Sequence, residues 1–315
     1  MITVREAKEK FQGVCVPVVT VLQEDGSIDI DGIQSNIQWM IDQGAKQGNT
    51  ILLACGSGGD FTVLNTFERK ATIKAIAEVS SGHVPVMASV QSTDIRETIE
   101  LCQLCEDVGI DLVQMSGHYY YTVVPEDVIA WVEEVSKHTN VGFAIYNHFY
   151  SGSKYDMSVE VAERLIEIPN SVAAKWGSAD RSNLIQGFKR LIPKVAVINN
   201  GGLQAYAHML GCKSYISHVP NFFPQQDWKV CELLEQGKYT EAEKVFDNFM
   251  IPYSKIRASI ATAGEGVFVR PFMEAVGLKA GVSKLPSRDS VVTPEIHKAI
   301  RDLLKKRQQF QARSS

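Results

Sequence analysis

The chain has 315 residues, of which 45% are hydrophobic and 22% are charged. These fractions are close to the average for globular proteins and argue against a disordered chain, a collagen-like repeat or a coiled-coil rod. The 32 basic and 36 acidic residues give a formal net charge of −4, which does not suit a protein that binds nucleic acid by neutralising phosphates.

No apolar run reaches the roughly 18 residues that span a bilayer, and the opening MITVREAKEKFQG lacks the apolar centre of a signal peptide. We therefore expect a cytoplasmic protein with no membrane partner. Six cysteines are too few for a disulfide scaffold in a chain of this length, and the CxxC pair Cys102 and Cys105 has no second pair to complete a zinc site. Both fall at helical spacing with apolar residues, so we expect them in the core.

Over the first 220 residues or so, short β-branched runs alternate with longer amphipathic stretches, which is the pattern of βα units around a parallel sheet. Parallel strands are buried on both faces and read as near-continuous apolar runs. Runs of this character lie at 13–20, 50–55, 84–90, 111–116, 141–147, 171–176, 194–199 and 213–218. Eight such units predict a closed (β/α)8 TIM barrel in preference to an open doubly wound sheet.

The stretches between these runs carry ordinary helix signals. After the first strand, Ile33, Ile37 and Met40 recur on one helical face. After the third strand, Ser92 or Thr93 is the expected N-cap. Pro125 is expected to open the helix after the fourth strand.

Beyond residue 220 the pattern is helical only. It predicts helices over 225–236, over 239–262 with an interruption at Pro252, and over 293–311. We therefore predict a barrel over residues 1–235 and a C-terminal helical region over residues 236–315.

In a TIM barrel the reactive groups lie at the carboxyl ends of the strands. Lys175 lies there, near the end of the run SVAAKW, among apolar neighbours. Lysine is rarely fully buried unless it is paired or functional. Burial favours its neutral amine, a nucleophile that can attack a ketone and form an imine. The alternative is a lysine that reaches solvent or pairs with an acid such as Asp180.

Tyr146 closes the preceding strand, so its hydroxyl and the lysine amine are expected to project from neighbouring strand ends. Imine formation needs a proton on the departing hydroxyl group, and a positioned tyrosine can supply it. The alternative is a tyrosine that packs its ring and bonds its hydroxyl to the backbone.

A glycine-rich turn, GSGGD over residues 56–60, follows the second strand. It lacks both GxGxxG and GxxxxGK[ST], so it does not indicate a nucleotide site. Its backbone N–H groups can converge on a small anion such as a carboxylate, and Ser57 adds a hydroxyl. The alternative is a plain strand-to-helix turn.

Taken together, these residues resemble the dihydrodipicolinate synthase and N-acetylneuraminate lyase family of class I, Schiff-base-forming enzymes. The resemblance covers nearly the whole chain. It rests on the GSGGD turn and on the segments GVCVPVVTVLQEDGSID at 13–29, YYY at 119–121, IYN at 145–147, AAK at 173–175 and YISHVPNFFP at 215–224.

The resemblance implies an aldolase or dehydratase in which Lys175 forms an imine with pyruvate or another 2-oxo acid and Tyr146 relays protons. Ser57 would link the relay to the substrate carboxylate, and Tyr120 would match a tyrosine that reaches a neighbouring subunit. The expected substrate-binding residues are Gly56, Gly58, Gly201 (or Asn200), Ile216, His148 and Ser151. No metal and no cofactor are expected, and the protein is expected to be a homo-oligomer, a dimer or a tetramer.

Several residues depart from the family pattern. Gly58 stands where a second hydroxyl residue is common, and Asp60 replaces the usual glutamate. The proline of YNxP is lost in YNHFYSG, and Ser151 stands where the synthases carry an arginine for a substrate carboxylate. That last difference counts against dihydrodipicolinate synthesis. Trp176 follows the lysine where an acid is usual, which suggests a different environment at the barrel mouth.

Two alternatives remain at this point. His118, His148 and His218 lie at strand ends and could hold zinc together with Asp60 for hydrolysis, although neither an HxH pair on the first strand nor an HExxH motif is present. A catalytically silent barrel that binds a small ligand is the other alternative.

Overall fold

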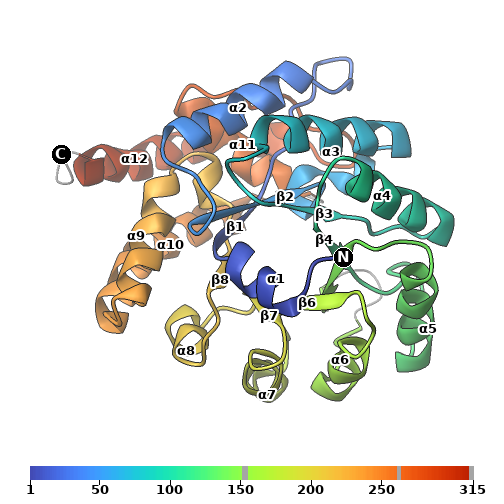
Figure 1. The fold of residues 1–315 in the computed structure, drawn as a ribbon. Coiled ribbons are helices and arrows are strands. Elements are labelled where there is room, and N and C mark those ends of the chain that lie inside the picture. Colours follow the sequence, from blue (N-terminus) through green and yellow to red (C-terminus); the bar gives the residue numbers. More distant parts are fainter. Residues whose placement is uncertain (151–154, 261–263, 312–315) are drawn as a thin grey trace. The chain divides into compact units, whose positions relative to one another are not determined.

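The computed structural model describes residues 1–150, 155–260 and 264–311, and it contains the eight predicted strands, paired in chain order into a closed parallel barrel (Figure 1). Gly13 pairs with Ser214 where the first and last strands close the barrel. The strands are β1 (Gly13–Pro17), β2 (Thr50–Ala54), β3 (Val86–Ser89), β4 (Leu112–Met115), β5 (Gly142–Tyr146), β6 (Ser171–Trp176), β7 (Ala196–Asn199) and β8 (Ser214–Ile216). Together with helices between the strands and at the C-terminus, this is the predicted TIM barrel.

The barrel interior has an apolar layer below a polar one. Alternate residues of a strand face the same side. An apolar residue that faces the barrel interior can therefore be followed, two positions on, by a polar residue that also faces the interior. Buried apolar residues form the lower layer, among them Met87, Leu112, Ala144 and Ala173. Two residues further along the same strands stand Ser89, Gln114, Tyr146 and Lys175, all of them buried. The polar layer therefore lies at the carboxyl ends of the strands.

A short helix that the sequence did not predict, α1 (Val4–Lys10), lies across the amino ends of β6 and β7 (Figure 1). Its N-terminus is a capping box in which Thr3 and Glu6 satisfy each other's backbone N–H groups. Ala7 and Phe11 pack into the apolar layer of the barrel. At seven residues, the helix is too short to show a clear hydrophobic period.

The described chain forms two compact units that interleave along the sequence. One consists of residues 1–15, 46–54 and 80–216, and the other of residues 16–45, 55–79 and 217–315. A division at residue 235 stays a prediction from the sequence.

The first unit also holds the helices that follow β3 to β7. They are α4 (Ile95–Asp107), α5 (Pro125–Ser136), α6 (Val159–Leu165), α7 (Arg181–Leu191) and α8 (Gln204–Met209). Pro125 opens α5 as predicted, and Cys102 and Cys105 of α4 are buried. The predicted N-cap of α4 was wrong. Asp94 caps it by accepting the Arg96 N–H, while Ser92 accepts the N–H of Asp94 one step earlier.

The second unit is helical and has its own aromatic core. Its helices are α2 (Ile30–Asp42), α3 (Thr66–Ser80), α9 (Pro224–Glu235), α10 (Tyr239–Ser259), α11 (Gly266–Ala275) and α12 (Pro294–Gln311). Phe222, Phe249, Tyr253 and Phe272 lie in its core. Among the described residues, no helix combines the length and the apolar character that a bilayer crossing requires.

Two C-terminal expectations were wrong. α10 continues through Pro252, where the sequence analysis placed an interruption. α11 was not predicted at all. It contains Pro271, and a proline inside a segment argues against a helix there.

Trp176 also lies elsewhere than expected. Its indole packs against Gly187 of α7, where an added Cβ would stand only 2.0 Å from Nε1, and it donates to the Leu184 carbonyl at 3.2 Å. Adjacent strand residues face opposite sides, so Trp176 points outward to α7 and not toward the barrel mouth.

Candidate active site

Lys175 is buried in the polar layer of the barrel, with only 3% of its surface exposed. It pairs in register with Tyr146 on β5 and Ile198 on β7. Its amine lies 4.0 Å from the centroid of the Tyr146 ring and donates a hydrogen bond of 3.1 Å to Gln114 Oε1. Asp180, the acid that sequence reasoning offered as a partner, caps α7 by accepting the Asn183 N–H at 2.9 Å.

Tyr146 is buried beside the lysine, as the strand order predicted, with 1% of its surface exposed. Its hydroxyl is hydrogen-bonded to the hydroxyl of Tyr150, which follows the same strand. His148 stacks on the Tyr146 ring at a centroid distance of 4.9 Å. The structure thus brings together Lys175, Tyr146 and His148, three of the predicted site residues.

The barrel interior also holds a cysteine, Cys15, whose thiol is unreactive. Cys15 is fully buried in the apolar layer, and burial raises the pKa of its thiol to about 12, although the Lys175 charge acts in the opposite direction. The thiol therefore stays protonated at neutral pH and is a poor nucleophile.

Sequence reasoning missed a chain of buried amides and hydroxyls next to the lysine. Gln114 Nε2 donates to Ser89 Oγ at 3.0 Å and to Gln91 Oε1 at 2.8 Å. Gln91 Nε2 donates to Ser116 Oγ at 2.8 Å and lies 3.2 Å from His148 Nδ1. The only sequence signal was a polar residue at every second position near the ends of strands three and four.

Sequence reasoning also gave no role to Asn147. Its side-chain amide donates to Asp156 Oδ1 and to the Gly177 carbonyl, both at 2.7 Å, and its oxygen accepts the Met157 N–H at 2.9 Å. Asn147 therefore joins the end of β5 to the residues that precede α6 and that follow β6. This holds the backbone beside Tyr146 and His148 in place.

The GSGGD turn belongs to the second compact unit and forms a 3₁₀ turn over Ser57–Gly59. Two of its N–H groups are used within the turn, since Gly59 donates to the Gly56 carbonyl and Asp60 donates to the Ser57 carbonyl, and Phe61, which follows the turn, also donates to the Gly56 carbonyl. An anion could be bound only by the earlier N–H groups of this turn.

The Gly58 position is closed by a histidine. A Cβ added at Gly58 would stand 2.8 Å from His218 Nε2 and 3.0 Å from Pro17 Cβ. His218 lies just beyond β8, which ends at Ile216 and not at residue 218 as predicted. Its Nε2 is 3.3 Å from Glu265 Oε2. The hydroxyl residue common in the family at position 58 would therefore require the His218 ring to move in this chain.

Asp60 forms a buried ion pair with Arg270 of α11 at 2.5 Å, and Arg270 also donates to the Thr20 carbonyl at 3.0 Å. Burial raises the pKa of the Asp60 carboxyl, and Arg270 opposes that rise. Asp60 adopts a left-handed backbone conformation with φ of 57°. It therefore fixes the end of the GSGGD turn.

The remaining predicted residues are scattered. Tyr120 is 74% exposed and is not among the buried residues around Lys175. The Gly201 N–H donates to Asn199 Oδ1 at 2.9 Å. Ile216 packs on the apolar layer of the barrel interior. Ser151 lies outside the described residues.

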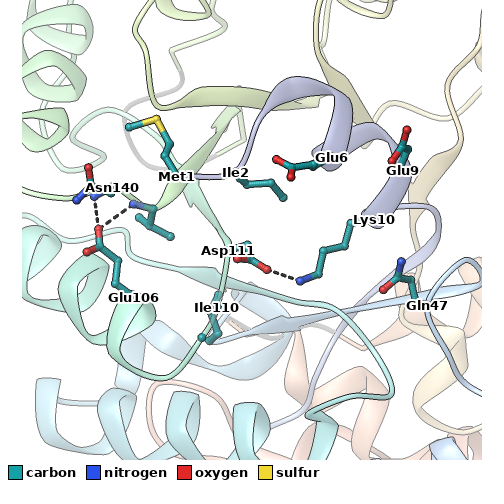
Figure 2. A pocket seen from close by; sticks show the side chains of 12 residues that line it. Met1, Ile2, Glu6, Glu9, Lys10, Gln47, Glu106, Ile110, Asp111 and Asn140 are labelled. Atoms are coloured by element: carbon teal, nitrogen blue, oxygen red, sulfur yellow. Dashed lines mark hydrogen bonds and ion pairs between the residues drawn. The ribbon is translucent and has the colours of Figure 1, made fainter.

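A cavity of about 640 Å³ opens at the other end of the barrel, beside α1 (Figure 2). Its acidic side chains have structural partners. Asp111 pairs with Lys10, Glu6 caps α1, and Glu106 accepts the backbone N–H groups of Asn140 and Val141. In a TIM barrel this end serves stability, whereas the reactive groups lie at the opposite end.

Within residues 1–150, 155–260 and 264–311, no group of three or more His, Cys, Asp or Glu side chains is placed to hold a metal ion. The zinc alternative built on His118, His148, His218 and Asp60 therefore lacks a ligand set in that part of the chain. His118 instead accepts the N–H groups of Tyr120 and Tyr121 at Nδ1.

Comparison with known proteins identifies the family of this chain. A model of the dihydrodipicolinate synthetase family matches residues 10–306. The chain is 24% identical over 277 residues to a 4-hydroxy-tetrahydrodipicolinate synthase of Clostridium perfringens, which covers 88% of this chain and 92% of that protein. It is 27% identical over 294 residues to a "Probable 5-dehydro-4-deoxyglucarate dehydratase" of Pseudomonas putida, which covers 91% of this chain and 93% of that protein.

Solved structures share the fold. A crystal structure of a dihydrodipicolinate synthase superposes with a TM-score of 0.82 at 25% identity, over 94% of this chain and 99% of that one. An N-acetylneuraminate lyase from Mycoplasma synoviae superposes with a TM-score of 0.79 at 22% identity, over 95% and 99%. The protein is thus a TIM-barrel lyase of the aldolase and dehydratase kind. It belongs to the dihydrodipicolinate synthetase family.

Proposed function

We propose that Lys175 forms an imine with a 2-oxo acid and that Tyr146, bonded to Tyr150, relays the protons of the reaction. The observation that carries the proposal is the position of the buried amine, 4.0 Å from the centroid of the Tyr146 ring, at the carboxyl ends of adjacent strands. A buried lysine tends toward its neutral, nucleophilic form. Support also comes from a family relative of known structure, a prophage protein of E. coli K12 that was crystallised in complex with pyruvate.

The chemistry follows from the imine. The Lys175 Nζ bonds to C2 of the 2-oxo acid, and the former carbonyl oxygen leaves as water after protonation through the tyrosine hydroxyls. The resulting iminium acidifies the C3 proton, and loss of that proton to the hydroxyls gives an enamine. C3 can then form or break a bond to an aldehyde carbon, or an oxygen on C4 can leave as water.

The substrate carboxylate is the proposed ligand of the GSGGD turn. Because the N–H groups of Gly59, Asp60 and Phe61 donate to carbonyls of the turn, the earlier residues Gly56, Ser57 and Gly58 would bind it. Ser57 would add its hydroxyl. Gly201, Ile216, His148 and Ser151 stay proposed substrate-binding residues. The family relatives of this chain include a synthase and a dehydratase. The substrate proposed for this chain is the feature that both kinds of reaction share, a 2-oxo acid.

The test is reductive trapping with borohydride in the presence of pyruvate and a panel of other 2-oxo acids, read by mass spectrometry. We expect one adduct per chain on Lys175, and its mass identifies the preferred acid. Lys175→Ala should fold, form no adduct and lose turnover. Lys189→Ala, which removes an exposed lysine of α7, is the matched control. Turnover retained by Lys175→Ala would refute the assignment.

We also propose a homo-oligomer in which Tyr120 contributes to the site of a neighbouring chain. Tyr120 and Tyr121 are 74% and 67% exposed, although tyrosine rings are largely apolar. Sedimentation should show a dimer or a tetramer, and Tyr120→Ala should lower turnover more than it lowers the yield of the pyruvate adduct. A fully active monomer would contradict this proposal.

A further inference from the structure

His148 belongs to the hydrogen-bonded chain that also includes Lys175. The chain runs from the lysine amine to Gln114, then to Gln91, and from Gln91 to His148 Nδ1. Gln91 and Gln114 are both buried. Inside a protein such amides are oriented by their partners, so the partners decide which atom faces which.

Both ends of this chain impose the same orientation. At one end the Lys175 amine donates, so Gln114 presents its oxygen there and its NH₂ to Gln91. At the other end Ser116 donates its proton to the Gly117 carbonyl at 3.2 Å, so toward Gln91 it accepts. Gln91 therefore presents its NH₂ to Ser116 and to His148, and its oxygen to Gln114.

An amide NH₂ can only donate, so His148 Nδ1 must accept. An imidazole with an acceptor at Nδ1 is neutral and carries its one proton on Nε2. A neutral imidazole of this kind can polarise a substrate oxygen by hydrogen bonding, but it cannot give its proton away at reasonable cost. The buried hydrogen bonds therefore give His148 a different role from the tyrosines: His148 donates a hydrogen bond, whereas the tyrosines transfer protons.

The place of the ring indicates which oxygen it polarises. His148 stacks on Tyr146 and meets the edge of Tyr150 at a centroid distance of 4.7 Å, and it lines a cavity of about 20 Å³ together with Tyr146 and Ser116. Tyr146 is in register with Lys175, so a ring that stacks on Tyr146 from two residues further along lies above the level of the lysine. It is placed for the part of the substrate beyond C3.

We propose that His148, held as the neutral Nε2–H tautomer by Gln91, donates a hydrogen bond to the oxygen on C4 of the substrate or of its aldehyde partner. This rests on the proposed imine at Lys175. When C3 of the enamine bonds to the aldehyde carbon, the carbonyl electron pair moves to that oxygen. His148 stabilises the charge there, and Tyr146 with Tyr150 returns the proton taken from C3. In cleavage the same steps run backward.

The tautomer is tested directly by NMR of the full-length protein labelled with ¹⁵N-histidine. His148→Gln identifies the signal among the seven histidines. We expect an unprotonated Nδ1 and a protonated Nε2. Gln91→Glu replaces the donor by an acceptor and should place a proton on Nδ1, whereas Gln103→Glu, the same change at an exposed position of α4, should leave the signal unchanged. A protonated Nδ1 in the wild type would overturn the proposal.

The role is tested with His148→Phe, which keeps a ring over Tyr146 and removes the donor. We expect the yield of the pyruvate adduct to stay unchanged and turnover with an aldehyde to fall by about 100-fold, as for loss of a donor to a developing oxyanion. Full turnover would overturn the proposal, and so would loss of the adduct. If the wild type itself formed no adduct with any 2-oxo acid, the imine would be refuted, while the NMR result would still decide the tautomer.

Discussion

The surroundings of Lys175 are both apolar and hydrogen-bonded. Ala173 lies in the apolar layer beneath it and Ile198 stands beside it on β7, while Gln114 accepts from its amine. The amide oxygen of Gln114 orients the amine without adding a negative charge beside it. This combination suits a lysine that must be both oriented and nucleophilic.

Gly58 and His218 should behave as a coupled pair. Gly58→Ala places a Cβ 2.8 Å from His218 Nε2 and 3.0 Å from Pro17 Cβ, and we expect this overpacking to cost about 1–3 kcal/mol of stability. The KM for the 2-oxo acid should rise as well. Adding His218→Ala should recover part of both losses, as measured by urea unfolding and by kinetics in a double-mutant cycle. Strictly additive effects would mean that the two residues do not compete for this space.

Sequence reasoning located Lys175 and Tyr146 because a strand places its end residues at a known edge of the barrel. It did not locate Gln91 and Gln114, because their roles depend on which strands are neighbours and in what register. It did not foresee that His218 closes the Gly58 position, since residues 160 positions apart meet there only after folding.

Strands were predicted better than helices, for a physical reason. A strand buried on both faces is visible as a short apolar run, and all eight runs are strands. α11 is an apolar run too, but it contains Pro271, a residue that argues against a helix interior. α1 has too few residues to show a period at all.

The packing of α7 on β6 depends on a glycine. In an exposed helix, replacing glycine by alanine gains about 1 kcal/mol. Gly187→Ala should instead destabilise the protein, because the new Cβ would stand 2.0 Å from Trp176 Nε1 and 2.1 Å from Cε2, a collision that costs at least about 1–3 kcal/mol. Urea unfolding measures the change. Trp176→Phe in the same chain should restore part of it, and a stabilised Gly187→Ala would contradict this packing.

Across the second compact unit, one buried ion pair joins the GSGGD turn to α11. Asp60 and Arg270 are separated by 210 residues in sequence and are both nearly inaccessible to solvent. A Cβ at Gly266 would stand 2.2 Å from Arg270 Nη1. The first residue of α11 is therefore a glycine, which leaves space for the Arg270 guanidinium. The C-terminal helices thus support a turn that follows the second strand.

Asp60→Asn should destabilise the protein by about 3–5 kcal/mol, because it leaves the Arg270 charge buried without its partner. Asp302→Asn is the control. Asp302 pairs with Lys298 and Lys305 on the exposed side of α12, where such pairs contribute about 0–1 kcal/mol. Chemical unfolding measures the free energy of unfolding of both variants. Equal losses of stability would show that burial does not determine how much these ion pairs contribute.

The apolar layer has a consequence for how protons reach the site. Leu112, Ala144 and Ala173, with Ala7 and Phe11 beneath them, carry no N–H or O–H group in their side chains, and the Cys15 thiol in the same layer stays protonated. We therefore expect the protons that Lys175 gains or loses to pass by way of the polar side chains above it. In the proposed reaction, the acid–base chemistry at Lys175 would then take place only at the carboxyl ends of the strands.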